Sequence, residues 1–309
     1  MNVFRFQFTG YNDTQLPALV WMPEGELRAV LQVTHGMTEH MERYEALAQE
    51  LTDYGIAVAG FDLRGHGKNA GDPQVASFGE GGWEASIEDM HLFFQAFHER
   101  LPDLPYYMLG FSLGSFLLRE YLGRYPEGVR GAVLVGTGYQ PELVLSGMTW
   151  LVKREIQKAG FDQTTELVKQ LAFGAYNRKF KPNRTDADWL CSDTQQLDYY
   201  LADPLCRKTI SAGLFLQMLE AMKRTGKKDT YQKWNKQIAV LLLSGCDDPV
   251  SEFGKGVYTV REQMHKAGIT RLTVQMLPKA RHDVFHEEKS RAADTTRALI
   301  AKWVLRNLG

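Results

Sequence analysis

A serine between two glycines is the clearest candidate for chemistry in this chain of 309 residues. Residues 110–114 read Gly-Phe-Ser-Leu-Gly and match G-x-S-x-G, the pattern of a nucleophilic serine on a sharp turn between a strand and a helix. Small residues are needed there because the strand and the helix pass close to each other. An apolar run at 106–109 precedes the motif and an amphipathic helical pattern follows it. The motif predicts Ser112 as a nucleophile for acyl transfer, with an ordinary helix N-cap serine as the alternative.

A nucleophilic serine needs a base, which the sequence offers in three downstream histidines. Where this motif is used, the acid and then the histidine follow the serine along the chain. His265 falls inside a predicted helix, where a solvated residue is the simpler interpretation. His286 lies in a loop or an early helical turn. His282 directly follows the last predicted strand, in a loop that can face the serine, and is therefore the favoured base.

Two adjacent carboxylates compete to orient that histidine. Asp247 and Asp248 follow the predicted strand 238–244 within Ser-Gly-Cys-Asp-Asp-Pro-Val. Asp248 precedes Pro249, which favours an extended backbone and a turn that can direct the side chain inward. We therefore favour Asp248 as the acid and interpret Asp247 as a solvated turn residue.

Stabilising a tetrahedral oxyanion requires main-chain N–H donors. One comes from the residue after the nucleophile and one from a loop after an early strand. Leu113 supplies the first, and Met37, in the loop that follows the predicted strand 29–34, supplies the second. His35 is better interpreted as a residue that shapes this loop than as a catalyst.

The spacing of apolar residues along the sequence predicts the strands and helices that position these residues. After three runs of strand character, the last of them mostly apolar, short apolar strands alternate with helices, which predicts an α/β fold with a mainly parallel sheet covered on both faces. The strands at the start of the chain are expected at one edge of that sheet. The predicted strands are 4–8, 16–22, 29–34, 56–61, 106–109, 132–135, 238–244 and 270–277, and the predicted helices are 44–54, 83–100, 113–125, 254–267 and 289–306.

The alternation lapses between residues 138 and 235, where the sequence is helical and irregular. Because regular strands flank this stretch, it is predicted to be an inserted cap over one end of the sheet. The core would then consist of residues 1–137 and 236–309. Apolar side chains in the cap would form a slot for an acyl chain, or, in the plainer alternative, simply pack a helical subdomain.

Composition excludes several functional classes. Lys and Arg total 36 against 37 Asp and Glu, and this balance argues against a nucleic-acid partner. Cys191, Cys206 and Cys246 form an odd, widely spaced set, which argues against a disulfide framework and favours a cytoplasmic location. The longest apolar run, 238–243, covers six residues and is too short to cross a bilayer. The N-terminus lacks the apolar core of a signal peptide.

Four blocks of sequence together resemble one branch of a known superfamily. They are His35-Gly36-x-x-Glu39-His40-x-x-Arg43-Tyr44, Asp62-x-Arg64-Gly65-His66-Gly67, residues 110–114, and Gly245-x-x-Asp248 with Arg281-His282. In this order they are similar to the monoglyceride lipase and lysophospholipase branch of the α/β-hydrolase superfamily, whose fold the resemblance implies. The loop at residues 64–67 is structural in such relatives. The sequence departs from such relatives at Met37-Thr38, where small residues are frequent, and at Lys68-Asn69, where a serine is common. These departures leave the exact substrate undetermined.

The resemblance implies a serine hydrolase of carboxylic esters with apolar acyl groups, acting on a small-molecule substrate through an acyl-enzyme. No cofactor and no metal are expected, since the glycine-rich loops already account for His35, His40 and His66. A peptidase or thioesterase on the same residues is one alternative, and Glu155, Glu166, Asp186, Asp188 and Glu220 could grip a substrate ammonium. A non-catalytic ligand-binding protein with this fold is another. Transient contact with lipid surfaces is compatible with the apolar substrate, and the oligomeric state is left open.

Overall fold

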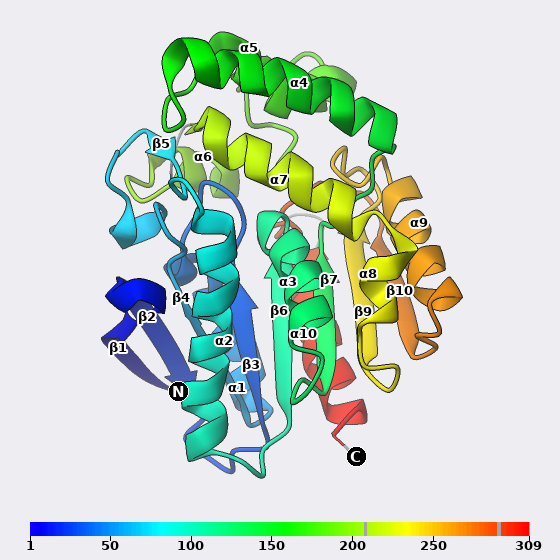
Figure 1. Cartoon of the computed structure of the whole chain (residues 1–309). Helices are drawn as coiled ribbons and strands as arrows, with labels where there is room; N and C mark the ends of the chain where they lie inside the picture. The colour runs from blue at the N-terminus through cyan, green and yellow to red at the C-terminus, as the bar shows by residue number, and fades with distance from the viewer. Residues whose placement is uncertain (207–208, 289–291, 309) are drawn as a thin grey trace.

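An eight-stranded sheet forms the centre of the molecule in the computed structural model, which describes residues 1–206, 209–288 and 292–308. The strand order is β1-β2-β4-β3-β6-β7-β9-β10 (Figure 1). The strands are β1 (Asn2–Thr9), β2 (Gln15–Met22), β3 (Ala29–Thr34), β4 (Ile56–Phe61), β6 (Tyr106–Phe111), β7 (Gly131–Val135), β9 (Ala239–Gly245) and β10 (Leu272–Leu277).

The sheet is antiparallel at one edge and parallel elsewhere. β1 pairs antiparallel with β2, and β2 pairs antiparallel with β4. From β4 to β10 every pairing is parallel. The predicted mainly parallel sheet is thus confirmed, but only the first two strands form its antiparallel edge. β3 lies between β4 and β6, and its six residues are all buried, as both faces of a central parallel strand are covered.

Helices cover both faces of the sheet. α2 (Gly82–Arg100), α3 (Leu113–Arg124) and α9 (Lys255–Lys266) contribute to one buried apolar cluster. α1 (Glu45–Asp53) and α10 (Ala292–Arg306) contribute to a second cluster on the other face. The last helix was expected to begin at 289, and residues 289–291 lie outside the described part of the chain. Short 3-10 turns are η1 (Tyr11–Asp13), η2 (Met41–Tyr44), η3 (Gly67–Asn69) and η4 (Tyr176–Phe180).

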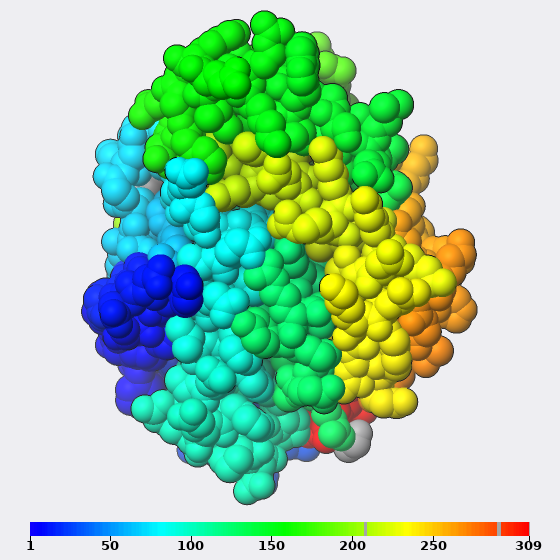
Figure 2. Space-filling view, in the orientation of Figure 1, coloured from blue at the N-terminus to red at the C-terminus, as the bar shows by residue number. Residues whose placement is uncertain are grey.

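The chain between β7 and β9 leaves the sheet and returns to it. Since β7 and β9 pair directly, this long excursion does not interrupt the sheet. Figure 1 shows α4, α5 and α7 stacked beyond one end of the strands, away from the two termini, and Figure 2 shows α4 and α5 as an outer layer above α7. The elements of this excursion are α4 (Glu142–Ala159), α5 (Glu166–Phe173), α6 (Thr194–Ala202), β8 (Thr209–Ile210), α7 (Ala212–Thr225) and α8 (Lys228–Gln232). β8 pairs with β5 (Val75–Ala76), which lies outside the excursion.

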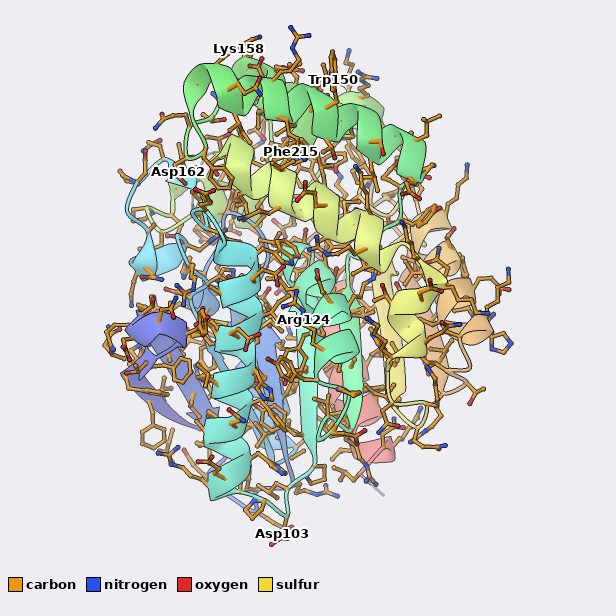
Figure 3. All side chains as sticks on the ribbon, in the orientation of Figure 1. Asp103, Arg124, Trp150, Lys158, Asp162 and Phe215 are labelled. Carbon is orange, nitrogen blue, oxygen red and sulfur yellow. The ribbon has the colours of Figure 1, made fainter. Side chains whose placement is uncertain are left out.

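Apolar side chains are gathered in the two clusters beside the sheet, and the cluster that includes α2, α3 and α9 continues into the contact between α4 and α7. Phe215 of α7 is 2% exposed and lies below α4, whereas Trp150 and Lys158 lie on the outer side of α4 (Figure 3). Among the helices of the described residues, none combines the length and apolar character that crossing a bilayer requires.

Candidate active site

Ser112 occupies the sharp turn that the sequence predicted, between the last residue of β6 and the first of α3. Its backbone has φ 49° and ψ −115°, a strained conformation for a residue with a side chain. A Cβ on Gly110 would lie 2.3 Å from the carbonyl oxygen of Gly114, and one on Gly114 would lie 2.1 Å from that of Thr34. Both glycines of the motif are therefore required by the close passage of backbone, and the turn presents Ser112 at the carboxyl end of the sheet.

His282 stands between Ser112 and Asp248. Its Nε2 lies 2.8 Å from Ser112 Oγ, and its Nδ1 lies 3.0 Å from Asp248 Oδ1. The Asp248 carboxylate also accepts hydrogen bonds from Ser244 Oγ at 2.9 Å and from the Val250 N–H at 2.8 Å. Asp248 and His282 are almost completely buried, so the imidazole has little freedom to turn away. Residues from the ends of β6, β9 and β10 thus converge at one point.

The alternative residues lie elsewhere. Asp247 is 40% exposed at its side chain and forms an ion pair with Lys179 at 2.9 Å. His265 is exposed on α9. His286 pairs through Nδ1 with Asp283 at 2.8 Å. Of the residues weighed from the sequence, only His282 and Asp248 form a chain of hydrogen bonds to Ser112.

The loop with the expected oxyanion donor Met37 is held in place by Glu39. Glu39 Oε1 accepts the Gly36 N–H at 2.6 Å, and its Oε2 accepts Arg43 Nε at 3.1 Å. Met37 and Ser112 line the same cavity, and Leu113 is the first residue of α3. The close contact of Gly114 with the end of β3 brings this loop beside the candidate nucleophile.

His35 is a shaping residue of the same loop. Its Nε2 accepts the Leu63 N–H at 2.9 Å, and its Nδ1 lies 2.7 Å from the Gly36 carbonyl oxygen, to which an N–H at Nδ1 donates. Complete burial lowers the pKa of His35, although Asp62 and Glu39 act in the opposite direction. The ring is therefore neutral, and both its nitrogens serve the main chain.

The second block of the resemblance also has a structural purpose. Asp62 accepts the Met41 N–H and the Lys68 N–H, each at 2.9 Å, and so joins two loops. Arg64 binds Asp89 with Nε at 2.6 Å and Nη2 at 2.9 Å. These contacts hold the loops beside the site in place, and Asp62 and Arg64 are therefore interpreted as structural residues.

A large cavity opens above Ser112. Its volume is about 880 Å³, within the range of small-molecule sites. Apolar side chains of α3, α7 and the acid loop line it beside the three converging residues, and polar and charged side chains of α5 and of the segment after it lie on its wall. Among the apolar ones are Met37, Phe116, Met218, Met222 and Val250.

Sequence reasoning missed an aromatic wall beside the base. The Trp189 ring lies 5.2 Å from that of His282, 4.8 Å from that of Tyr176 and 6.0 Å from that of Phe173, measured between centroids. Burial and the nearby Asp248 carboxylate raise the pKa of Tyr176. Phe173 ends α5, Tyr176 begins η4 and Trp189 lies further along the chain, so no single local pattern links them.

The loop that carries His282 is also hydrogen-bonded to the excursion between β7 and β9. The Asp283 N–H donates to the Leu190 carbonyl oxygen at 2.7 Å. Glu287 Oε1 accepts the Arg281 N–H at 2.8 Å and the Ser192 N–H at 2.9 Å. Burial raises the pKa of Glu287, while these hydrogen bonds lower it, and the net shift is upward. The position of His282 thus depends on residues nearly 100 positions away.

A serine on a strained strand-to-helix turn, a histidine bonded to it and a buried aspartate after a later strand define the α/β-hydrolase class on this sheet. The hydrolase family described as serine aminopeptidase, S33, matches residues 25–289. The chain belongs to this family, which confirms the resemblance drawn from the four sequence blocks.

Individual relatives extend the likeness over most of the chain. A monoglyceride lipase of Mus musculus is 26% identical over 289 residues, which cover 92% of this chain and 84% of the mouse protein. A monoacylglycerol lipase of Mycolicibacterium smegmatis is 27% identical over 205 residues, covering 64% of this chain and 63% of that protein. In fold, a thermostable carboxyl esterase from Bacillus coagulans, crystallised with glycerol, superimposes with a TM-score of 0.88 at 23% identity, covering all of both chains.

Proposed function

We propose that this protein is a serine hydrolase of carboxylic esters, with Ser112 as nucleophile, His282 as general base and Asp248 as the acid that orients the imidazole. The observation that carries the proposal is the pair of contacts made by His282, 2.8 Å to Ser112 Oγ and 3.0 Å to Asp248 Oδ1. An imidazole bonded in this way can take the hydroxyl proton as the serine attacks.

The reaction proceeds in two halves. Ser112 Oγ bonds to the ester carbonyl carbon while its proton moves to His282 Nε2, and Asp248 stabilises the imidazolium. The N–H groups of Met37 and Leu113 hold the oxyanion, and losing one such donor costs about 3–4 kcal/mol of transition-state stabilisation. Collapse expels the alcohol, which takes the proton from His282 and leaves an acyl-enzyme. A water oxygen then bonds to the acyl carbon while its proton moves to His282, and His282 returns this proton to Ser112 Oγ as the Oγ–acyl bond breaks and the acid leaves.

The substrate class follows from the cavity and the relatives. The cavity of about 880 Å³ has room for a medium or long acyl chain, and side chains such as Phe116, Met218 and Met222 give it apolar surface. The relatives from mouse and M. smegmatis are named for monoacylglycerol hydrolysis. We infer esters of apolar acyl groups, of the monoacylglycerol or lysophospholipid type.

Residues 138–235 act as a cap in this proposal. They leave the sheet after β7 and return before β9, and their side chains form much of the cavity wall. The outer side of α4 exposes Leu143 (85%) and Trp150 (56%), with Arg154 over the Trp150 ring at 5.0 Å. An apolar surface with an adjacent cation suits contact with the lipid phase from which such substrates come.

An aminopeptidase is the second candidate, favoured by two carboxylates. Glu166 and Asp186 line the cavity and could bind a substrate ammonium. Lys169 on the same wall weakens that attraction. The other acidic residues considered from the sequence are engaged, Glu155 with Lys158, Glu220 with Lys153 and Asp188 with the 184–185 turn.

A fluorophosphonate probe and a substrate panel test these assignments. We expect the probe to label wild-type protein at Ser112 and not the Ser112→Ala variant. A monoacylglycerol or lysophospholipid should give a higher kcat/KM than thioester or aminoacyl arylamide substrates. A folded protein that binds fatty ligands but leaves Ser112 unlabelled would be a non-catalytic binding protein. Faster cleavage of the arylamide would establish the aminopeptidase.

A further inference from the structure

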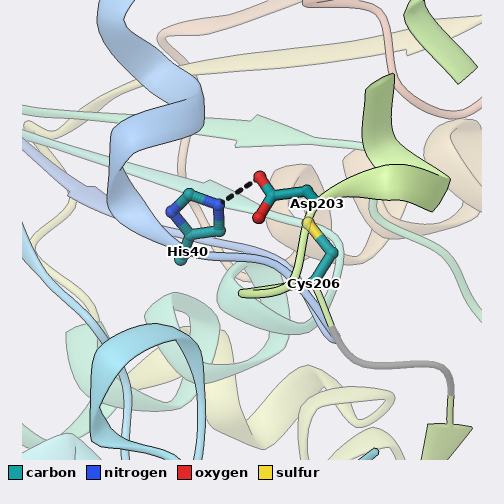
Figure 4. Close-up of side chains that lie close together, drawn as sticks. All are labelled: His40, Asp203 and Cys206. Carbon is teal, nitrogen blue, oxygen red and sulfur yellow. Dashed lines mark hydrogen bonds and ion pairs between the residues drawn. The ribbon is translucent and has the colours of Figure 1, made fainter. Parts of the chain in front are cut away.

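Three side chains with metal-binding atoms meet beside the cavity, which Cys206 lines, apart from the residues of the proposed mechanism. His40 belongs to the loop after β3, and Asp203 and Cys206 follow α6, more than 160 positions later. One donor atom from each of the three lies within 4.8 Å of the others, and His40 Nε2 is 2.8 Å from Asp203 Oδ2 (Figure 4). His40 and Cys206 are buried, at 4% and 8% exposed.

The three donors are an imidazole nitrogen, a carboxylate oxygen and a sulfur, a set that suits zinc. A tetrahedral zinc ion with bonds of about 2.0–2.3 Å holds its donor atoms about 3.5 Å apart. The separations here range from 2.8 Å to no more than 4.8 Å, so they bracket that value. Side-chain rotations can therefore bring all three donors onto one ion, which would replace the direct contact between His40 and Asp203.

The charges around the cluster favour a cation. Among the described residues, Arg43 is a cation near it, and it already contacts Glu39 at 3.1 Å and Asp283 at 2.8 Å. With Asp203, three carboxylates thus surround one guanidinium. A divalent ion would offset this local negative charge.

The cluster borders the cavity through Cys206. Cys206, Thr38 and Glu39 all line the space above Ser112, so a fourth ligand can enter from there. His40 Nδ1 is buried and has no hydrogen-bond partner among the described residues, so the imidazole lacks the outer support that strengthens metal sites. With three protein ligands, and with a His40 ring that no second residue in the described part of the chain supports, we expect zinc to bind with moderate affinity.

We propose that His40, Asp203 and Cys206 form a zinc site beside the Ser112 cavity, with a fourth ligand entering from the cavity next to Cys206. Zinc binding displaces the thiol proton of Cys206 to solvent and forms a sulfur–zinc bond. Because His40 and the oxyanion donor Met37 share one loop, the ion also ties that loop to the segment after α6.

The test uses full-length protein without a polyhistidine tag, treated with EDTA and then dialysed free of chelator. Zinc chloride is titrated by calorimetry, and cobalt chloride is added as a spectroscopic probe of thiolate coordination. We expect one zinc ion with a Kd of about 1–100 µM and a sulfur-to-cobalt charge-transfer band. Cys206→Ser should abolish the band, and Cys206→Ser, Asp203→Asn and His40→Asn should each weaken zinc binding at least about tenfold.

Matched controls separate this cluster from other donors. Cys246→Ser removes a half-exposed thiol and His265→Gln an exposed imidazole, and neither should change the zinc affinity. Thermal unfolding checks that each ligand variant is folded. A Kd above about 1 mM, or a cobalt band that survives in Cys206→Ser, would overturn the proposal. The binding readouts do not require ester hydrolysis, so they distinguish failure of this site from failure of the proposed reaction.

Discussion

At the scale of single residues, identical side chains differ in their surroundings. Asp247 and Asp248 are neighbours in sequence, yet Lys179 and solvent meet the first, while Ser244, Val250 and His282 surround the second. A carboxylate can orient an imidazole only when it is buried against it and held by further donors. The pair therefore offers an internal comparison for the proposed acid.

Replacing each aspartate tests that difference. Asp248→Asn should lower kcat for a soluble ester by about 10³- to 10⁴-fold, since the amide no longer stabilises the imidazolium or the right tautomer. Asp247→Asn has the same change in charge and size and should alter kcat by no more than a few-fold. Steady-state kinetics on the two folded variants measures this, and the reverse ranking would assign the acid to Asp247.

His35 gives a prediction about pH. In the unfolded chain its imidazole gains a proton at about pH 6.5, whereas burial lowers the pKa in the folded protein. Between these two pKa values the unfolded state binds more protons, so the His35 contribution to stability is lost as the pH falls below about 6.5. Nitrogen NMR of the ring should show a neutral Nδ1–H tautomer that does not titrate at about pH 6.5. A normal titration of this ring would contradict the assignment.

At the scale of elements, the site depends on how closely a strand and a helix approach. β6, α3 and the end of β3 meet at Gly110 and Gly114, where a Cβ would clash with main-chain oxygens. Main chain cannot rotate out of the way as a side chain can. The motif is therefore as much a packing requirement as a chemical one.

Two glycine substitutions separate packing from helix propensity. Gly114→Ala should lower the free energy of unfolding by about 1–3 kcal/mol or more, because the added methyl group meets the Thr34 carbonyl oxygen. Gly147→Ala lies on the exposed side of α4 with nothing within 4 Å, and should raise it by about 0.5–1 kcal/mol. Chemical denaturation measures the free energy of unfolding of both variants. Equal changes in that free energy would show that the close approach of main chain at Gly114 does not limit which residue fits there.

The outer side of α4 carries a prediction about lipid surfaces. Trp150→Ala and Leu143→Ala together should reduce the fraction of protein that sediments with phosphatidylcholine vesicles, because they remove apolar area from the exposed face. Tyr258→Ala on α9 is a matched control, since Tyr258 and Trp150 are both 56% exposed. An equal loss for the control, or no loss for the double variant, would argue against contact through α4.

At the scale of the whole molecule, residues at the ends of the sheet and residues of the excursion between β7 and β9 line one cavity. The sheet supplies Ser112, Asp248 and His282, while the excursion between β7 and β9 supplies the aromatic wall and the contacts that hold the histidine loop. Movement of residues 189–192 would therefore disturb the base as well as the cavity. Residues 189–192, and not the outer helices α4 and α5, make these hydrogen bonds to the histidine loop.

The cavity allows a test of acyl-chain selection. Met222→Trp places a larger ring on the half-buried cavity side of α7, and should lower kcat/KM for a dodecanoyl ester more than for an acetyl ester, because the longer chain competes for that space. Fluorophosphonate labelling of the variant checks that Ser112 is still reactive. Equal losses for both esters would indicate that acyl chains do not reach Met222.

The sequence by itself determined the alternation of strands and helices and the nucleophile turn. These are local properties, since periodicity and glycine positions report on a few neighbouring residues. It also placed Ser112, Asp248 and His282 at the ends of predicted strands, because the carboxyl ends of parallel strands meet at one edge. The family match confirms the class that these blocks indicated.

Only the tertiary structure decided which distant side chains meet. Trp189 against His282, Glu287 against Ser192 and His40 against Asp203 join segments separated by about 90 residues or more, and no local pattern encodes them. The sequence interpretation of His40 as a residue of a glycine-containing loop involves neither Asp203 nor Cys206, which only the tertiary structure brings beside it. Packing of an irregular segment against the sheet fixes these pairs, since its conformation follows from burial and hydrogen bonding to the core rather than from its own periodicity.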